Sequence, residues 1–193
     1  SQVAHQGEAA HRYVLGLYRL LDRITAAYPA LLIESCSSGG ARFDPGMLYY
    51  VAQNWTSDNT DGHDRLAIQR GYSLLYPPEV MGAHVSITPN HQTGRTTPLE
   101  TRWQAARLFN LGYELDLSLL SEEERQAIAA QIARHKTERG WLQTSRFYTL
   151  ALPGPYSGWA ALAADGSRCL VQVFQLRYDP RFAHTPVRLP PGR

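Results

Sequence analysis

The fold class is decided by residues 31–42, which read LLIESCSSGGAR. Residues 12–28 before them carry apolar side chains at the three- and four-residue spacing of a helix, which Pro29 ends. Three apolar residues then lead into small and polar ones. A short apolar strand that follows a helix and ends in a polar loop is typical of a parallel sheet buried on both faces. The chain is therefore predicted to be an α/β protein.

The alternation of strands and helices continues to about residue 140. It includes two short stretches, 47–51 and one ending at Trp55, and then segments at 64–76, 82–87, 101–108 and 109–117. We count four strand-plus-helix units in about 140 residues, whereas a complete (β/α)8 barrel needs about 250. Polar clusters follow the strands, as barrel active sites do, at 36–42, 55–61 and 84–95. These features predict the C-terminal half of a (β/α)8 TIM barrel.

The sequence pattern changes after one more helix. Ser121 and Glu124 form a capping box at its start, and Gly140 is expected to end it. Strand-like segments then follow one another without helices, at 147–152, 159–163 and 169–178, with a hairpin turn predicted at Asp165-Gly166.

This change of pattern predicts two domains. We expect residues 1–140 to form the second half of the catalytic barrel and residues 141–193 to form a partial antiparallel β domain. Neither part has the length of a complete domain of its kind, so both ends of the chain are expected to be truncated.

Composition excludes several classes of protein. The 19 Lys and Arg against 17 Asp and Glu give a net charge of +2, too balanced for a nucleic-acid binder. No run of 18 apolar residues exists, and the first residues lack the pattern of a signal peptide, so we expect no membrane partner. Two cysteines, Cys36 and Cys169, form no disulfide framework, which predicts a reduced, cytoplasmic protein.

Two loops that follow predicted strands carry candidate chemistry. Residues 36–42 are rich in glycine, which allows close approach to a ligand, although a tight turn with positive φ is the simpler interpretation. Residues 55–61 combine Trp55 with Asp58 and Asp61. An aromatic ring and carboxylates suit the C–H face and hydroxyls of a sugar. Asp58 fits a general acid and a helix cap equally well, whereas Asp61 is interpreted as a cap.

No metal or other cofactor is predicted. The spacing of His63, His84 and His91 matches no zinc signature, and no paired cysteines or Glu-x-x-His support one. Cys36 lacks the partner residues of a thiol nucleophile. The remaining tryptophans are interpreted as core or interface residues: Trp103, Trp141 and Trp159.

Several longer motifs occur in order along the chain: ESCSSGGARFD at 34–44, WTSDNTD at 55–61, MGAHVS at 81–86, PNHQTGR at 89–95, TPLETR at 97–102 and GYELD at 112–116. Together they resemble the microbial α-galactosidases of glycoside hydrolase family thirty-six. The similarity runs nearly continuously from His11 to Leu120. It implies a (β/α)8 barrel with a C-terminal antiparallel β domain, in agreement with the count of units above.

The resemblance implies a retaining α-galactosidase that hydrolyses terminal α-galactosides of raffinose-type oligosaccharides. In such enzymes one Asp attacks the anomeric carbon and a second protonates the leaving oxygen. The Trp-x-Ser-Asp motif of the family makes Asp58 the general acid/base. Trp55 is then expected to line the sugar subsite and to shield Asp58 from water, and Cys36 and Gly39 to contact the galactose.

The chain departs from the family pattern in one important respect. The family nucleophile lies in a Lys-x-Asp motif on an earlier strand, and no such motif occurs here, where Lys136 is the only lysine. Ala41 also replaces a usual glycine. We therefore expect this fragment to be inactive alone. Its exposed inner face and strand edges are expected to make it self-associate as a homo-oligomer or to leave it poorly stable alone.

Other functions remain open at this point. Two are related activities, a galactosyl-transferring enzyme or an α-N-acetylgalactosaminidase of the same family. A third is a non-catalytic module that binds sugar or has a purely structural role.

Overall fold

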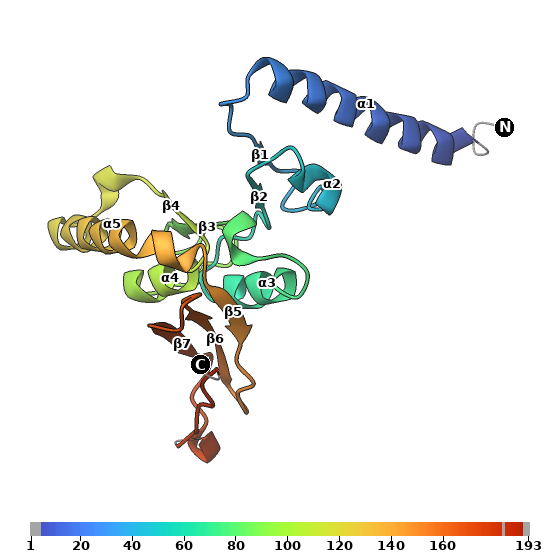
Figure 1. Cartoon of the computed structure of the whole chain (residues 1–193). Helices are drawn as coiled ribbons and strands as arrows, with labels where there is room; N and C mark the ends of the chain where they lie inside the picture. Colours follow the sequence, from blue (N-terminus) through green and yellow to red (C-terminus); the bar gives the residue numbers. More distant parts are fainter. Residues whose placement is uncertain (1–4, 183, 191–193) are drawn as a thin grey trace.

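Four parallel strands form the first sheet, and helices alternate with them along the chain (Figure 1). The computed structural model describes residues 5–182 and 184–190. The strands pair in chain order, and each neighbouring pair is parallel. They are β1 (Glu34–Ser35), β2 (Gln53–Trp55), β3 (Met81–Ser86) and β4 (Asn110–Glu114). Consecutive parallel strands joined through helices confirm the predicted α/β half barrel.

Most of the helices lie where the sequence predicts them. They are α1 (Gln6–Ala27), α2 (Pro45–Leu48), α3 (Asp64–Tyr72), α4 (Leu99–Ala106) and α5 (Glu122–Leu142). The short helix α2 occupies part of the stretch expected at 47–51, because the Asp44 carboxylate accepts a hydrogen bond from the Met47 amide and Pro45 suits the first turn. None of the described helices is both long and apolar enough to cross a bilayer.

The ends of α5 show one correct and one wrong prediction. The capping box of Ser121 and Glu124 is present, with both reciprocal bonds formed. The expected end at Gly140 is wrong, since the helix continues to Leu142. Leu142 is buried in the main core, and this packing outweighs the low helical preference of the glycine.

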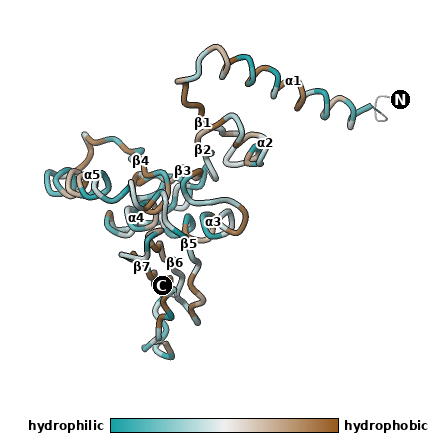
Figure 2. The backbone as a smooth tube through the Cα atoms, viewed as in Figure 1, coloured by the Kyte–Doolittle hydropathy of each residue, from teal (hydrophilic) through white to brown (hydrophobic). Residues whose placement is uncertain are grey.

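The apolar run 31–33 is not a buried strand, contrary to expectation. The strand β1 begins only at Glu34, and Leu32 is 83% exposed in this chain. The apolar segment between α1 and β1 (Figure 2) exposes Leu31 and Leu32, whereas Ile33 is half-buried against the small core cluster of Leu21, Met47 and Val51. Within the described residues β1 pairs with β2 alone. Its parallel direction nevertheless agrees with the predicted sheet.

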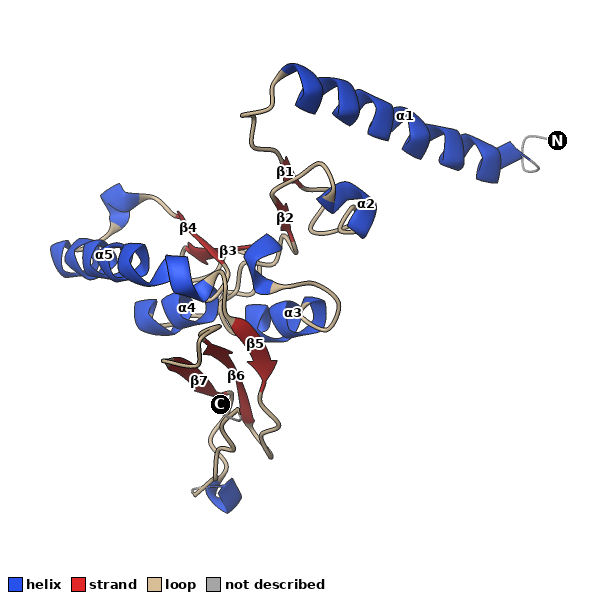
Figure 3. Cartoon of the chain, viewed as in Figure 1, coloured by secondary structure: helices blue, strands red, loops and turns tan. Residues whose placement is uncertain are grey.

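A second, antiparallel sheet follows α5, as predicted (Figure 3). Its strands are β5 (Arg146–Thr149), β6 (Tyr156–Leu162) and β7 (Cys169–Gln175). The turn between β6 and β7 contains Asp165-Gly166, and Gly166 has a φ of +75°. Such a conformation is strained for other residues, which explains why this dipeptide marks the hairpin.

One apolar core joins the two sheets through α4. Trp103 on α4, Phe109 before β4 and Trp159 on β6 all belong to it, and Trp159 is fully buried. The Gln172 side chain on β7 also donates to the Gln104 carbonyl at 2.8 Å. The barrel half and the β sheet therefore support each other, and the domain boundary at residue 140 stays a prediction.

Candidate functional site

The predicted acid/base lies where the strands of the parallel sheet end. Asp58 follows β2 directly and lines a cavity of 270 Å³ at the carboxyl ends of β2, β3 and β4. The other residues that line it are Trp55, Thr60, Ser86, Ile87, His91 and Glu114. Larger cavities exist: none of the predicted site residues lines one of 790 Å³ between α4 and β7, and Gly39 lines another of 570 Å³, but Asp58 and Trp55 meet only in the smaller one. The smaller cavity is therefore the candidate active site.

Trp55 holds Asp58 by a polar contact. Its indole N–H donates to Asp58 Oδ1 at 3.1 Å. The indole itself is buried, whereas Asp58 is exposed. The expected shielding of Asp58 from water stays a prediction for the complete enzyme, whereas in this chain the ring meets Asp58 through its N–H edge. What Trp55 supplies is orientation of the carboxyl group.

The glycine-rich loop packs on the backbone that carries Asp58. Gly39 has a φ of +74°, and a Cβ atom there would lie 2.5 Å from the Asp58 amide nitrogen. Gly40 also has a positive φ and abuts the Thr56 carbonyl. The interpretation as a tight turn with positive φ is confirmed, and the glycines make room for the chain's own backbone; contact of this loop with a ligand stays a prediction. Cys36 is free and exposed at the end of β1.

The buried side chain of Arg65 binds the backbone of the loop that carries Asp58. The Arg65 guanidinium donates to the carbonyls of Ser57 at 3.1 Å and Gly82 at 2.7 Å. It also lies 4.6 Å from the centroid of the Trp55 ring. Burial lowers the pKa of Arg65 to about 10, against a smaller opposing influence of Tyr72. Sequence reasoning missed this residue, because its position on α3 suggests only a surface charge.

Asp61 has the structural role that the sequence favours. Its Oδ1 accepts from the amides of His63 at 2.9 Å and Asp64 at 3.0 Å, which caps the start of α3. Thr93 and Arg95 bind the same carboxylate. Burial acts to raise the pKa of Asp61, but these hydrogen bonds outweigh it, and the pKa lies below its ordinary value.

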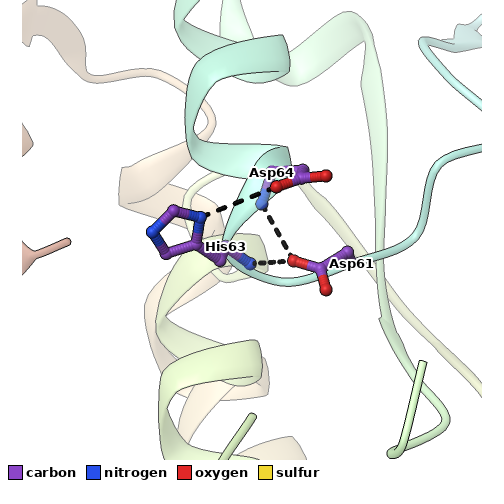
Figure 4. A group of neighbouring side chains, drawn as sticks. All are labelled: Asp61, His63 and Asp64. Atoms are coloured by element: carbon purple, nitrogen blue, oxygen red, sulfur yellow. Dashed lines mark hydrogen bonds and ion pairs between the residues drawn. The ribbon is translucent and has the colours of Figure 1, made fainter. Parts of the chain in front are cut away.

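Three side chains at the start of α3 could in principle hold a metal ion (Figure 4). Asp61, His63 and Asp64 offer ligand atoms within 4.8 Å of one another. However, the Asp61 oxygens already accept several hydrogen bonds, and Arg95 forms ion pairs with both carboxylates. The guanidinium thus takes the place that a cation would need, and we assign the cluster to capping.

Comparison with known proteins identifies the family of the chain. Residues 1–145 match the melibiase family. The chain belongs to this family. It is 53% identical to the α-galactosidase AgaA of Geobacillus stearothermophilus over 173 residues, which are 89% of this chain and 24% of the relative. It is 46% identical to the α-galactosidase Mel36A of Lactobacillus acidophilus, with 87% of this chain and 23% of the relative covered.

Solved structures of melibiase relatives share the fold. AgaA in complex with raffinose superposes with a TM-score of 0.93 at 48% identity, covering 98% of this chain and 27% of that one. The α-galactosidase of Lactobacillus brevis gives a TM-score of 0.93 at 42% identity, with 98% and 26% covered. The chain thus spans about a quarter of the length of these relatives.

Proposed function

We propose that this chain is the second half of the catalytic barrel of a retaining α-galactosidase. Its substrates would be terminal α-galactosides of the raffinose type. The proposal rests on the position of Asp58, which lines the candidate cavity just after β2 and accepts a hydrogen bond from Trp55. Support comes from AgaA, whose structures were solved with raffinose and with stachyose.

In the first chemical step Asp58 would act as the general acid. It donates its proton to the glycosidic oxygen while a second carboxylate attacks the anomeric carbon and forms a galactosyl-enzyme. The indole N–H of Trp55 holds one carboxyl oxygen at 3.1 Å, which would leave the other oxygen for the proton transfer. No Lys-x-Asp motif occurs in the chain, so the attacking carboxylate has to come from another part of the enzyme.

In the second step Asp58 would act as a base. Its carboxylate takes a proton from water, whose oxygen attacks the anomeric carbon and releases galactose from the nucleophile. Two displacements retain the α configuration. Such a mechanism requires the two carboxyl groups to stand about 5 Å apart.

The proposal is tested with a complete enzyme that contains this chain. Incubation with raffinose should release galactose, and proton NMR of the fresh product should show the α anomer first. Asp58→Asn should remove nearly all of this activity, whereas Asp165→Asn, in the exposed β6–β7 turn, should leave it unchanged. Release of the β anomer, or no release at all, would contradict the proposal. Transfer of galactose to an added acceptor in preference to water would identify a galactosyl-transferring enzyme.

Location in the cytoplasm is part of the same proposal. Both cysteines, Cys36 and Cys169, are free and exposed, which suits a reducing compartment. Fractionation of cells that express the complete enzyme, with an antibody against this chain, would check the location.

A further inference from the structure

The side chains of Glu114, His84 and Trp55, on three neighbouring strands, contact one another in a row that reaches Asp58. Trp55 on β2 is paired with Gly82 on β3, and its ring stacks on His84 with centroids 4.4 Å apart and planes at 24°. His84 is in turn paired with Gly112 on β4. Its Nδ1 lies 3.0 Å from Oε2 of Glu114, two residues further along that strand. The Trp55 ring therefore lies over Gly82 and reaches His84, and the His84 ring lies over Gly112 and reaches Glu114.

The two glycines provide the space for this arrangement. A Cβ atom on Gly112 would lie 2.6 Å from Cδ2 of His84, and one on Gly82 would lie 3.2 Å from Cε3 of Trp55. Side chains two residues apart share one face of a strand, so Gly82 and His84 face the same side, as do Gly112 and Glu114. The pattern Gly-x-His followed by Gly-x-Glu thus builds a row that ends at Asp58.

We propose that His84, held by Glu114, is a positioning residue for the acid/base, acting through Trp55. The Glu114 carboxylate accepts the Nδ1–H bond and fixes the plane of the imidazole. The imidazole supports the flat face of the indole, and the indole N–H then meets Asp58 Oδ1. This inference rests on the proposed function, because it assigns His84 to the proton transfer that Asp58 performs.

The kinetic test compares substrates with poor and good leaving groups in the complete enzyme. His84→Ala should lower kcat/KM for raffinose about tenfold to a hundredfold, since the oriented hydrogen bond to Asp58 is lost. An aryl α-galactoside with a good leaving group should lose much less, because it needs less protonation. His84→Phe keeps a stacking ring and should recover most of the raffinose activity.

Two further variants separate positioning from general support. His135→Ala removes another half-buried histidine, on α5 and away from the cavity, and should lower both substrates' rates equally or not at all. In a double-mutant cycle, His84→Ala should have little further effect once Trp55→Phe has removed the indole N–H. Additive losses would overturn the proposal.

A structural readout stands apart from activity. In a crystal structure of the His84→Ala enzyme, the separation of Trp55 Nε1 and Asp58 Oδ1 should exceed the hydrogen-bond limit of about 3.5 Å. An unchanged separation, or equal losses on both substrates, would refute the role of His84. An unmodified enzyme that fails to hydrolyse α-galactosides would instead refute the proposed function. If His84→Ala does not fold, Glu114→Ala, at an exposed position, serves instead: it should lower kcat/KM for raffinose more than for the aryl galactoside, by a smaller factor than expected for His84→Ala.

Discussion

At the residue scale, two aspartates three positions apart have opposite surroundings. Asp58 is exposed, and the indole N–H of Trp55 holds it at the edge of a cavity. Asp61 is fully buried, and every bond it accepts serves the fold. A carboxylate surrounded by donors cannot reach a substrate, which is why we propose Asp58 rather than Asp61 as the acid/base.

Substitution of Asp58 should produce a dependence on the leaving group. In the complete enzyme, Asp58→Ala should lower the rate of raffinose hydrolysis by a factor of about 10² to 10⁴, the usual contribution of general acid catalysis. Aryl galactosides with good leaving groups should suffer less, and azide should partly restore their turnover, because it attacks without needing a base. Asp61→Ala should instead cost about 2 kcal/mol of stability and show neither effect. The reverse result would mean that the wrong aspartate has been assigned.

The stability that Asp61 supplies should depend on pH. Its pKa is lower in the folded chain than the value of about 3.9 in an unfolded one, so the ionised form stabilises the fold. This contribution is present above about pH 4 and is lost as the pH falls through the folded-state pKa. The gap in unfolding temperature between wild type and Asp61→Asn should therefore narrow below pH 4.

At the element scale, the site depends on one loop packed against another. The turn that contains Gly39 touches the backbone of Ser57 and Asp58, while Arg65 on α3 holds the Ser57 carbonyl. Neither loop is placed by its own sequence alone. Three elements, β1, β2 and α3, therefore determine together where the acid/base stands.

A methyl group at Gly39 should move the acid/base. Gly39→Ala adds both the strain of a positive φ, about 1–2 kcal/mol, and a clash with the Asp58 amide. We expect reduced kcat with raffinose in the complete enzyme. Gly94→Ala is a matched control, since Gly94 has a φ of +69° but no atom within 4 Å of a new Cβ. It should lose similar backbone stability and keep its kcat. Equal kcat values for the two variants would show that the Gly39 contact is irrelevant to catalysis.

At the scale of the whole molecule, this chain leaves large apolar side chains exposed. Leu32, Leu74 and Leu75 are 83%, 74% and 80% exposed. The strands at both ends of the parallel sheet, β1 and β4, pair on one side only within the described residues. Exposed apolar surface and open strand edges favour association with other chains.

The chain by itself should therefore associate. Sizing chromatography with light scattering should give species larger than 21.6 kDa. Leu32→Glu combined with Leu75→Glu should shift the profile toward the monomer, since charges oppose burial of these surfaces. A cooperatively melting monomer in the unmodified chain would contradict the expectation.

Purified as these 193 residues alone, the chain should also show no turnover of any α-galactoside. A general acid without a nucleophile cannot form the covalent intermediate of a retaining mechanism. The measurement is galactose release from an activated aryl galactoside, with a complete enzyme as the positive control. Reproducible hydrolysis that disappears with Asp58→Ala would overturn the assignment of a missing nucleophile.

Local patterns in the sequence determined the α/β class, the parallel strands, the capping box of α5 and the hairpin at Asp165-Gly166. These features depend on spacing, caps and turns among neighbouring residues, which is why they can be predicted. The same patterns predicted that Asp58 follows a strand and that Asp61 caps a helix.

The tertiary structure decided what depends on distant contacts. Burial of Leu142 carried α5 past Gly140, and β1 begins only at Glu34, which leaves Leu31 and Leu32 exposed. The contact of Arg65 with the Asp58 loop, and the row from Glu114 through His84 to Trp55, join residues 8 to 30 positions apart in the sequence. Such contacts follow from sheet register and helix packing, which bring together residues that no local pattern connects.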